Sequence, residues 1–275
     1  MTIYHFIAGL PRSGSTLLAG ILRQNPAFRA AMSSPVFPVF NAALSAMGGS
    51  NEFAVFFQPE QKARILRGIL DGYYGDDRDA RAVFDTNRLW TARLPALRTL
   101  YPDSRLVACV RNPAWIIDSI ETLVRRNALD ASRLFGTEGE RLSVYARAAA
   151  LMDKSRLVGS SYLALKEAYY SQDAAAMLIL DYDTLVAQPK DAIALLYQFL
   201  RMPSFPHDFS QVTYQAEVFD TQLLAKGLHD VSGPVAPRPR PTVLPPDLFQ
   251  KYAAMDFWTR RDSRAHFITR SEPAG

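Results

Sequence analysis

The chain has 275 residues, 48% of them apolar, which suffices for the core of one compact domain, and it contains no run near the roughly 20 apolar residues of a membrane helix. We therefore expect one cytoplasmic domain without a membrane span, and the single cysteine, Cys109, excludes an internal disulfide and a cysteine-based metal cluster. The net charge of +4 fits an anionic ligand, but the basic residues are spread along the chain, which argues against nucleic acid as a partner.

Short apolar runs alternate with helical segments along the chain. The predicted strands cover 3–9, 82–85, 105–111 and 176–182, and the predicted helices cover 15–24, 113–126, 141–171 and 189–200. This alternation is typical of a parallel sheet with helices on its faces. We predict an α/β fold in which a central parallel β-sheet is flanked by helices, as a single domain over 1–275.

Three segments depart from this alternation. Residues 220–246 contain six prolines and are too apolar for a plain linker, so we predict a lid or closing loop there. The stretch 33–60 suits a flat substrate pocket, a core segment or the contact of a homodimer, and the sequence leaves these alternatives open. The tail 263–275 is expected to be frayed.

The turn after the first strand, GLPRSGST at 9–16, has the glycine spacing of a phosphate-binding loop. Gly14 lets backbone N–H groups close around a phosphate, and the following helix adds the positive end of its dipole. A triphosphate loop carries lysine where this chain has Ser15, and here the cation is Arg12, inside the turn. The pattern predicts a site for a single 5′-phosphate group without an obligatory metal ion.

A second pair of anion-binding residues follows the predicted strand 105–111. Arg111 ends this strand, where side chains face the ligand crevice of an open α/β sheet, and Ser119 follows eight residues later on the next helix. Together, the two side chains are able to hold one phosphate. Taken alone, Arg111 in a surface ion pair and Ser119 in a small helix position are the ordinary alternative.

The two motifs in this order resemble the signatures of sulfotransferases that use 3′-phosphoadenosine 5′-phosphosulfate (PAPS). The likeness is closest to the bacterial branch related to tyrosylprotein sulfotransferases, and it implies a P-loop-like, sulfotransferase-type fold. In that family the first motif holds the 5′-phosphosulfate, a role that falls here to Arg12, Ser13, Gly14, Ser15 and Thr16. The second motif holds the 3′-phosphate, which implies the same role for Arg111 and Ser119.

Two later segments extend the resemblance. LDYDTLVAQPKDAIALLYQFLRMP is similar to a strand and helix of the same branch and implies that Tyr182 lies near the cofactor. LLAKGLHDVSG resembles a closing loop in which Lys226 and Gly227 approach the 3′-phosphate. The donor implied by the whole resemblance is PAPS, with no metal required.

The general base does not follow from the resemblance. Tyrosylprotein sulfotransferases use a glutamate shortly after the first helix, but the corresponding stretch RAAMSSPVF has no acid. We assign the base to Asp85 with Arg88 as a sulfate contact, because this region approaches the transferred group in related enzymes; a helix cap is the alternative for Asp85. The histidines are weak alternatives for the base: only His229 falls in the predicted lid, and a structural or exposed role is the favoured expectation for each histidine.

The predicted reaction is in-line transfer of a sulfuryl group from PAPS to a hydroxyl, with Arg12 and the loop amides stabilising the departing phosphate. A phenol, with a pKa of about 10, needs a weaker base than an aliphatic alcohol, so a phenolic acceptor such as a peptide tyrosine is slightly favoured. One alternative is a Mg-dependent, kinase-like P-loop enzyme with Asp181 or Asp183 at the metal. The other is a noncatalytic nucleotide-binding protein.

Overall fold

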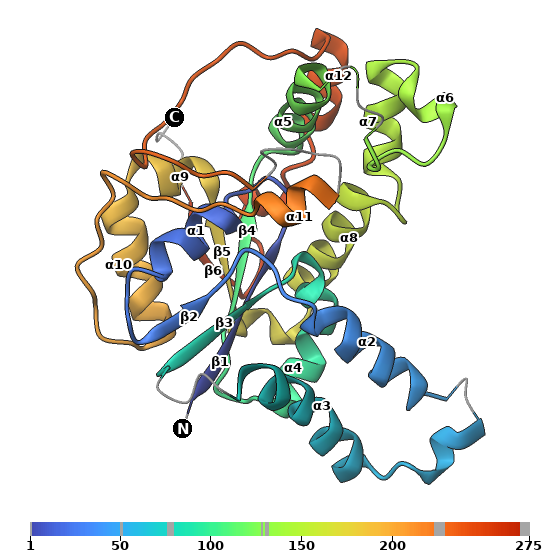
Figure 1. Ribbon diagram of the computed structural model, residues 1–275, viewed down its shortest axis with the longest axis vertical. Coiled ribbons are helices and arrows are strands. Elements are labelled where there is room, and N and C mark those ends of the chain that lie inside the picture. Colours follow the sequence, from blue (N-terminus) through green and yellow to red (C-terminus); the bar gives the residue numbers. More distant parts are fainter. Residues whose placement is uncertain are drawn as a thin grey trace.

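The computed structural model describes residues 2–49, 52–75, 80–127, 129, 132–222 and 229–269. Its centre is a six-stranded parallel sheet with the strand order β2-β3-β1-β4-β5-β6 (Figure 1). The strands are β1 (Ile3–Gly9), β2 (Phe28–Ala30), β3 (Ala82–Thr86), β4 (Leu106–Val110), β5 (Met177–Asp181) and β6 (His266–Ile268). The predicted α/β fold with a central parallel sheet is confirmed.

Helices cover both faces of the sheet. One face carries α1 (Ser15–Leu22), α9 (Tyr182–Ala187) and α10 (Pro189–Leu200). The other carries α2 (Val36–Ala46), α3 (Pro59–Tyr74), α4 (Leu94–Leu100), α5 (Pro113–Arg126), α7 (Val144–Met152), α8 (Leu157–Tyr170) and α12 (Pro246–Ala253). The shorter elements are α6 (Glu138–Arg141), α11 (Glu217–Gln222) and the 3₁₀ helices η1 (Glu52–Phe56), η2 (Arg88–Arg93), η3 (Gln172–Ala176) and η4 (Phe257–Arg260).

The central strands are buried on both faces, which explains why their sequences are continuous apolar runs. Successive side chains of a strand point to opposite faces. Phe6 and Ala8 of β1 accordingly enter the core under α2–α8, whereas Ile7 enters the core under α1 and α10. The sheet therefore holds two apolar cores apart and leaves the strand ends for polar groups.

The start of α5 shows why sequence predicts some boundaries well. The side chain of Asn112 accepts a hydrogen bond from the Ala114 amide at 3.0 Å, and Pro113 occupies the first helical turn. The helix ends at Arg126, as predicted, and the Asn127 amide donates to the Leu123 carbonyl at 3.1 Å. This helix follows Arg111 and carries Ser119, so its start fixes the second motif.

The stretch 33–60 divides between core and surface. Phe37 and Phe40 of α2 pack edge-on against Trp90, with ring centroids 5.0 and 5.3 Å apart. Helices α2 and α3 then project from the sheet as an arm (Figure 1), and η1 exposes Phe53 and Phe56. The core alternative therefore holds for the first half of this stretch.

The expectation for the tail 263–275 needs a correction. Residues 266–268 form β6, which pairs in parallel with β5 through the register Leu178↔His266. The remaining residues 270–275 lie outside the described part of the chain. Three residues on an edge are too few for a strand pattern to be recognised, and the same is true of β2. In the described ranges, no helix has the length and apolar character needed to cross a bilayer.

Candidate functional site

A cavity of about 550 Å³ lies at the carboxyl ends of the central strands. Its walls include Gly14 after β1, Thr86 at the end of β3, Arg111 after β4 and Tyr182 after β5. Open α/β sheets bind ligands at this edge, and a cavity of this size accommodates a small-molecule ligand. The topology thus brings the first and second predicted motifs to one place.

The loop after β1 is fixed to β4 by hydrogen bonds. The Leu10 amide donates to the Cys109 carbonyl at 2.9 Å. Ser13 is buried, and its hydroxyl lies within hydrogen-bond distance of the Leu10 carbonyl and, at 2.9 Å, of the Cys109 carbonyl. The Ser13 side chain therefore shapes the turn from behind the cavity wall, and the contacts of the loop to an anion have to come from its other groups.

Helix α1 begins directly at the cavity. Gly14 has a φ of 91°, and a Cβ built on it would lie 2.8 Å from the ring of Tyr182. The first helical bond runs from the Leu18 amide to the Gly14 carbonyl, so the amides of residues 15–17 precede the helical ladder. Ser15 and Thr16 line the cavity. Amides at a helix start, together with the helix dipole, form an anion site.

Arg12 links the two predicted motifs. Its Nε donates to Oγ of Ser119 at 3.1 Å, across 107 residues of sequence, and Arg12 itself lines the cavity. Burial and then the neighbouring charge of Arg111 lower the pKa of Arg12. Because an arginine still stays protonated, two positive charges lie close together at this end of the cavity. Such an arrangement favours a ligand with more than one negative charge.

Two buried polar atoms at the cavity have no partner in the described structure. They are Nε of Arg111 and Oγ1 of Thr86. The guanidinium of Arg111 lies over the ring of Tyr182, 4.4 Å from its centroid, and this contact holds the side chain in place. A phosphate ligand would accept a hydrogen bond from the unpaired Nε–H of Arg111 and would satisfy this buried donor.

Asp85, the predicted base, is turned away from the cavity, which corrects our expectation. It is fully buried and accepts hydrogen bonds from Ser34 at 2.6 Å, Tyr74 at 2.7 Å and Trp90 at 2.6 Å. Burial raises the pKa of Asp85 despite these three bonds. Successive strand residues face opposite ways, so Thr86 reaches the cavity from β3 and Asp85 does not.

The other polar residues predicted near the strand ends also have defined positions. Arg88 lines the cavity, as its assignment as a sulfate contact requires. The helical turn that follows is capped by Asn87, whose side chain accepts from the Leu89 amide at 3.0 Å, rather than by Asp85. Asp181, the metal ligand of the kinase-like alternative, caps α9 through the amide and hydroxyl of Thr184, at 2.9 and 3.0 Å.

The predicted lid does face the cavity. Residues 229–236 and Arg238 form one of its walls. This wall is held from one side by the antiparallel bridge Tyr214↔Val231 and by the bond from the Val235 amide to the Phe209 carbonyl at 2.9 Å. Lys226 and Gly227, the predicted contacts to the 3′-phosphate, lie outside the described residues.

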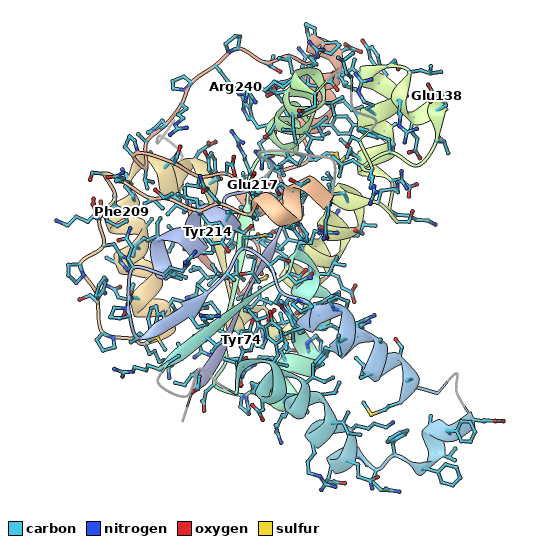
Figure 2. All side chains as sticks on the ribbon, viewed as in Figure 1. Tyr74, Glu138, Phe209, Tyr214, Glu217 and Arg240 are labelled. Atoms are coloured by element: carbon cyan, nitrogen blue, oxygen red, sulfur yellow. The ribbon has the colours of Figure 1, made fainter. Side chains whose placement is uncertain are left out.

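The far end of the lid is tied to α5, the helix that carries Ser119. Arg240 pairs with the buried Asp118 and lies beside α5 (Figure 2). The hydroxyl of Thr242 and the amide of Val243 also donate to Oδ1 of Asp118, both at 2.7 Å. The lid is therefore fastened at both ends, against 209–214 and against α5.

Sequence reasoning missed one pair of residues at this site. Nδ1 of His229 lies 2.5 Å from Oδ1 of Asp220, and the His229 amide donates to Oδ2 of the same carboxylate at 2.9 Å. His229 lines the cavity. The sequence showed a histidine in the predicted lid but gave no signal for its carboxylate partner, because only the folded chain brings α11 beside residue 229.

Comparison with known proteins agrees with this architecture. The nodulation protein NoeE of Sinorhizobium fredii (strain NBRC 101917 / NGR234) is 31% identical over 133 residues, which make up 42% of this chain and 30% of that protein. The chain thus spans under a third of this relative's length. The sulfotransferase domain from the curacin biosynthetic pathway shares the fold, with a TM-score of 0.53, 17% identity and coverage of 92% of this chain and 96% of that domain.

Sulfotransferase STF9 from Mycobacterium avium is a more distant structural neighbour, with a TM-score of 0.46 and 14% identity over 96% of this chain and 78% of that one. The family assignment comes from the sequence. Residues 5–207 match the model of the sulfotransferase family, and this range contains the loop after β1, Arg111 and Ser119. Because the match covers most of the sequence, the chain belongs to the sulfotransferase family.

Proposed function

We propose that this protein transfers a sulfuryl group from PAPS to a hydroxyl acceptor. Membership of the sulfotransferase family supports sulfuryl transfer in general. The observation that carries the choice of donor is the junction of the two phosphate motifs, in which Arg12 bonds Ser119 beside the orphaned Nε of Arg111. A nucleotide with phosphate groups at both ends of its ribose matches this pair of cationic positions.

The residues divide between the two ends of the donor. Arg12 and the amides at the start of α1 hold the 5′-phosphosulfate. Arg111 and Ser119 hold the 3′-phosphate; because the Ser119 oxygen accepts from Arg12, its own hydroxyl hydrogen is available for the ligand. Tyr182 supports the Arg111 guanidinium, and Lys226 and Gly227 complete the 3′-phosphate contacts in this proposal.

Transfer requires stabilisation of the charge that develops on the departing phosphate. Arg12 and the loop amides supply this stabilisation, so the proposal needs no metal ion. Arg88, which lines the cavity after β3, contacts the sulfuryl group in this proposal. We favour a phenolic acceptor, as a small molecule or a peptide tyrosine, because a phenol with a pKa of about 10 loses its proton more readily than an alcohol.

Calorimetric titration with adenosine 3′,5′-bisphosphate, 5′-AMP and Mg-ATP tests the donor site. We expect micromolar binding of the bisphosphate and weaker binding of the other two. Arg111→Ala should weaken bisphosphate binding about 10- to 100-fold, because a hydrogen bond to a charged group contributes about 1.5–3 kcal/mol. The exposed Arg126→Ala on α5 is the matched control and should leave the affinity unchanged.

Two results of this titration would contradict the assignment of the donor site. Binding of Mg-ATP without binding of the bisphosphate would contradict the proposal. Asp181 and Asp183 would then be the residues to replace, as in the kinase-like alternative. Bisphosphate binding that Arg111→Ala leaves intact would place the 3′-phosphate away from the second motif.

A further inference from the structure

The acceptor proton needs a base, and few side chains in the cavity wall are able to accept it. The charged or titratable groups that line the cavity are Arg12, Arg88, Arg111, Tyr182, His229, Asp230 and Arg238. Guanidinium groups are donors only. Tyr182 lies beneath the Arg111 cation, and Asp230 is an exposed carboxylate, a weaker base than an imidazole. His229 is the remaining group, and an imidazole is the side chain that most often transfers protons in catalysis.

The contacts of His229 fix both its position and its tautomer. Asp220 uses both carboxylate oxygens on this one residue, with Oδ1 at the ring Nδ1 and Oδ2 at the backbone amide. Nδ1 therefore carries the ring proton, and Nε2, on the other side of the ring, is the proton acceptor. Phe219 packs edge-on against the imidazole, with centroids 5.5 Å apart, and also lines the cavity.

The burial of the pair also fits this role. The side chain of Asp220 is 2% exposed and that of His229 is 22% exposed, so the carboxylate is shielded while the imidazole meets the cavity. The charged groups around the ring are Asp220 on α11, Asp230 on the lid and Arg12. The guanidinium of Arg12 interacts electrostatically with the carboxylate of Asp220. A shielded carboxylate stabilises the imidazolium that forms when the ring takes a proton.

From this geometry we infer that His229 is the general base of sulfuryl transfer and that Asp220 is its positioning residue. The inference rests on the proposed function. As the acceptor oxygen forms its bond to sulfur, its proton passes to Nε2 of His229. The bond between sulfur and the 5′-phosphate oxygen breaks, its electron pair leaves with adenosine 3′,5′-bisphosphate, and the imidazolium releases the proton to solvent.

The first test measures kcat with PAPS and a series of phenols of decreasing pKa. His229→Gln should lower kcat about 10²- to 10⁴-fold, the usual contribution of a general base, and should leave bisphosphate affinity unchanged. The loss should shrink for the more acidic phenols, because they need less help to lose their proton. The control is His266→Gln, exposed on the edge strand β6, which should keep kcat. Asp230→Asn tests the neighbouring carboxylate of the cavity wall as a rival base.

The second test addresses Asp220 by comparing kcat with ligand affinity. In Asp220→Asn, kcat with PAPS and a phenol should fall, because the amide no longer fixes the tautomer of His229. The affinity for the bisphosphate should stay the same, because Arg12 and Arg111 keep their contacts. A residue that only supported the lid would change this affinity.

The outcomes separate the inference from the function on which it rests. If the kcat of His229→Gln lies within about threefold of the wild-type value, the assignment of the base is wrong but the proposed function stands. The same conclusion follows if Asp230→Asn loses kcat while His229→Gln remains active. A wild-type protein that binds no bisphosphate or sulfates none of the phenols or alcohols offered overturns the proposed function, and the base assignment with it. Bisphosphate affinity in each variant reports that the fold is intact.

Discussion

The loop after β1 and the lid segment 229–238 wall the same cavity, but different parts of the chain hold them. The loop is bonded to the buried strand β4 through the Leu10 amide and the Ser13 hydroxyl. The lid is bonded to residues 209–214, which lie outside the six-stranded sheet and meet the lid through the isolated bridge Tyr214↔Val231. Val212, Tyr214 and Val235 pack in the core under α1 and α10. The two sides of the cavity are therefore held by different elements: a strand of the sheet holds the loop, and a segment outside the sheet holds the lid.

Two buried aspartates make the same contrast at the level of single residues. Asp85 on the sheet side receives three hydrogen bonds from core side chains. Asp220 on the lid side directs both oxygens at one residue that faces the cavity. Substitution of the first should therefore affect stability, and substitution of the second should affect turnover.

The largest expected effect is the loss of stability in Asp85→Ala. It leaves the hydroxyls of Ser34 and Tyr74 and the indole N–H of Trp90 without their acceptor, and each unsatisfied buried group costs about 1–3 kcal/mol. Urea unfolding should show a loss of at least about 3 kcal/mol, against about 1 kcal/mol or less for Asp220→Asn. Similar losses in both variants would remove the distinction between the two sides.

The pH dependence of stability sharpens the same contrast. Burial raises the pKa of Asp85 above its ordinary 3.8, so the folded protein holds this proton more tightly than the unfolded chain. Stability is therefore lost as the pH rises from about 3.8 through the folded-state pKa of Asp85. The free energy of unfolding of the wild type should therefore fall relative to that of Asp85→Asn as the pH rises above about 3.8. A difference between the two proteins that stays constant with pH would contradict the raised pKa of Asp85.

A matched pair of glycines compares the two sides with equal backbone strain. Gly14 and Gly233 have φ values of 91° and 88°, but a Cβ would meet the Tyr182 ring at 2.8 Å in the first and only the flexible end of Arg238 at 3.6 Å in the second. Gly233→Ala should cost about 1 kcal/mol of stability, and Gly14→Ala about 1–3 kcal/mol more from the overlap. Equal losses in thermal or urea unfolding would show that the ring of Tyr182 moves aside freely.

The smallest expected effect is the loss of stability on removing the hydrogen bond that joins the two sides of the cavity. Tyr214 lies in the segment 209–214 that holds the lid (Figure 2). Its hydroxyl accepts a hydrogen bond from the amide of Met32, which lines the cavity. Tyr214→Phe removes this acceptor and should cost about 1 kcal/mol of stability. Bisphosphate affinity should stay the same, because Arg12 and Arg111 keep their contacts; a large loss of affinity would mean that this hydrogen bond controls the cavity.

Sequence predicted the sheet side well because its signals are local. The glycine spacing of 9–16 and the start of the helix at Pro113 each depend on a few neighbouring residues, and the structure has both. The prediction failed for Asp85 because the sequence does not show which face of β3 packs against α3. The Asp85 side chain points to that face, where Tyr74 of α3 donates a hydrogen bond to it. The pairing of Asp220 with His229 was not predicted, because it depends on where the chain places α11; the sequence showed only that His229 lies in the predicted lid.

The bond between Arg12 and Ser119 has a thermodynamic consequence. It makes the two phosphate motifs one energetic unit, so loss of either side chain disturbs both ends of a ligand that spans them. Affinity losses from substitutions in contact do not simply add, and the deviation measures their coupling. Discrimination between ligands with one and with two phosphate ends is then a property of the pair, and it belongs to neither residue alone.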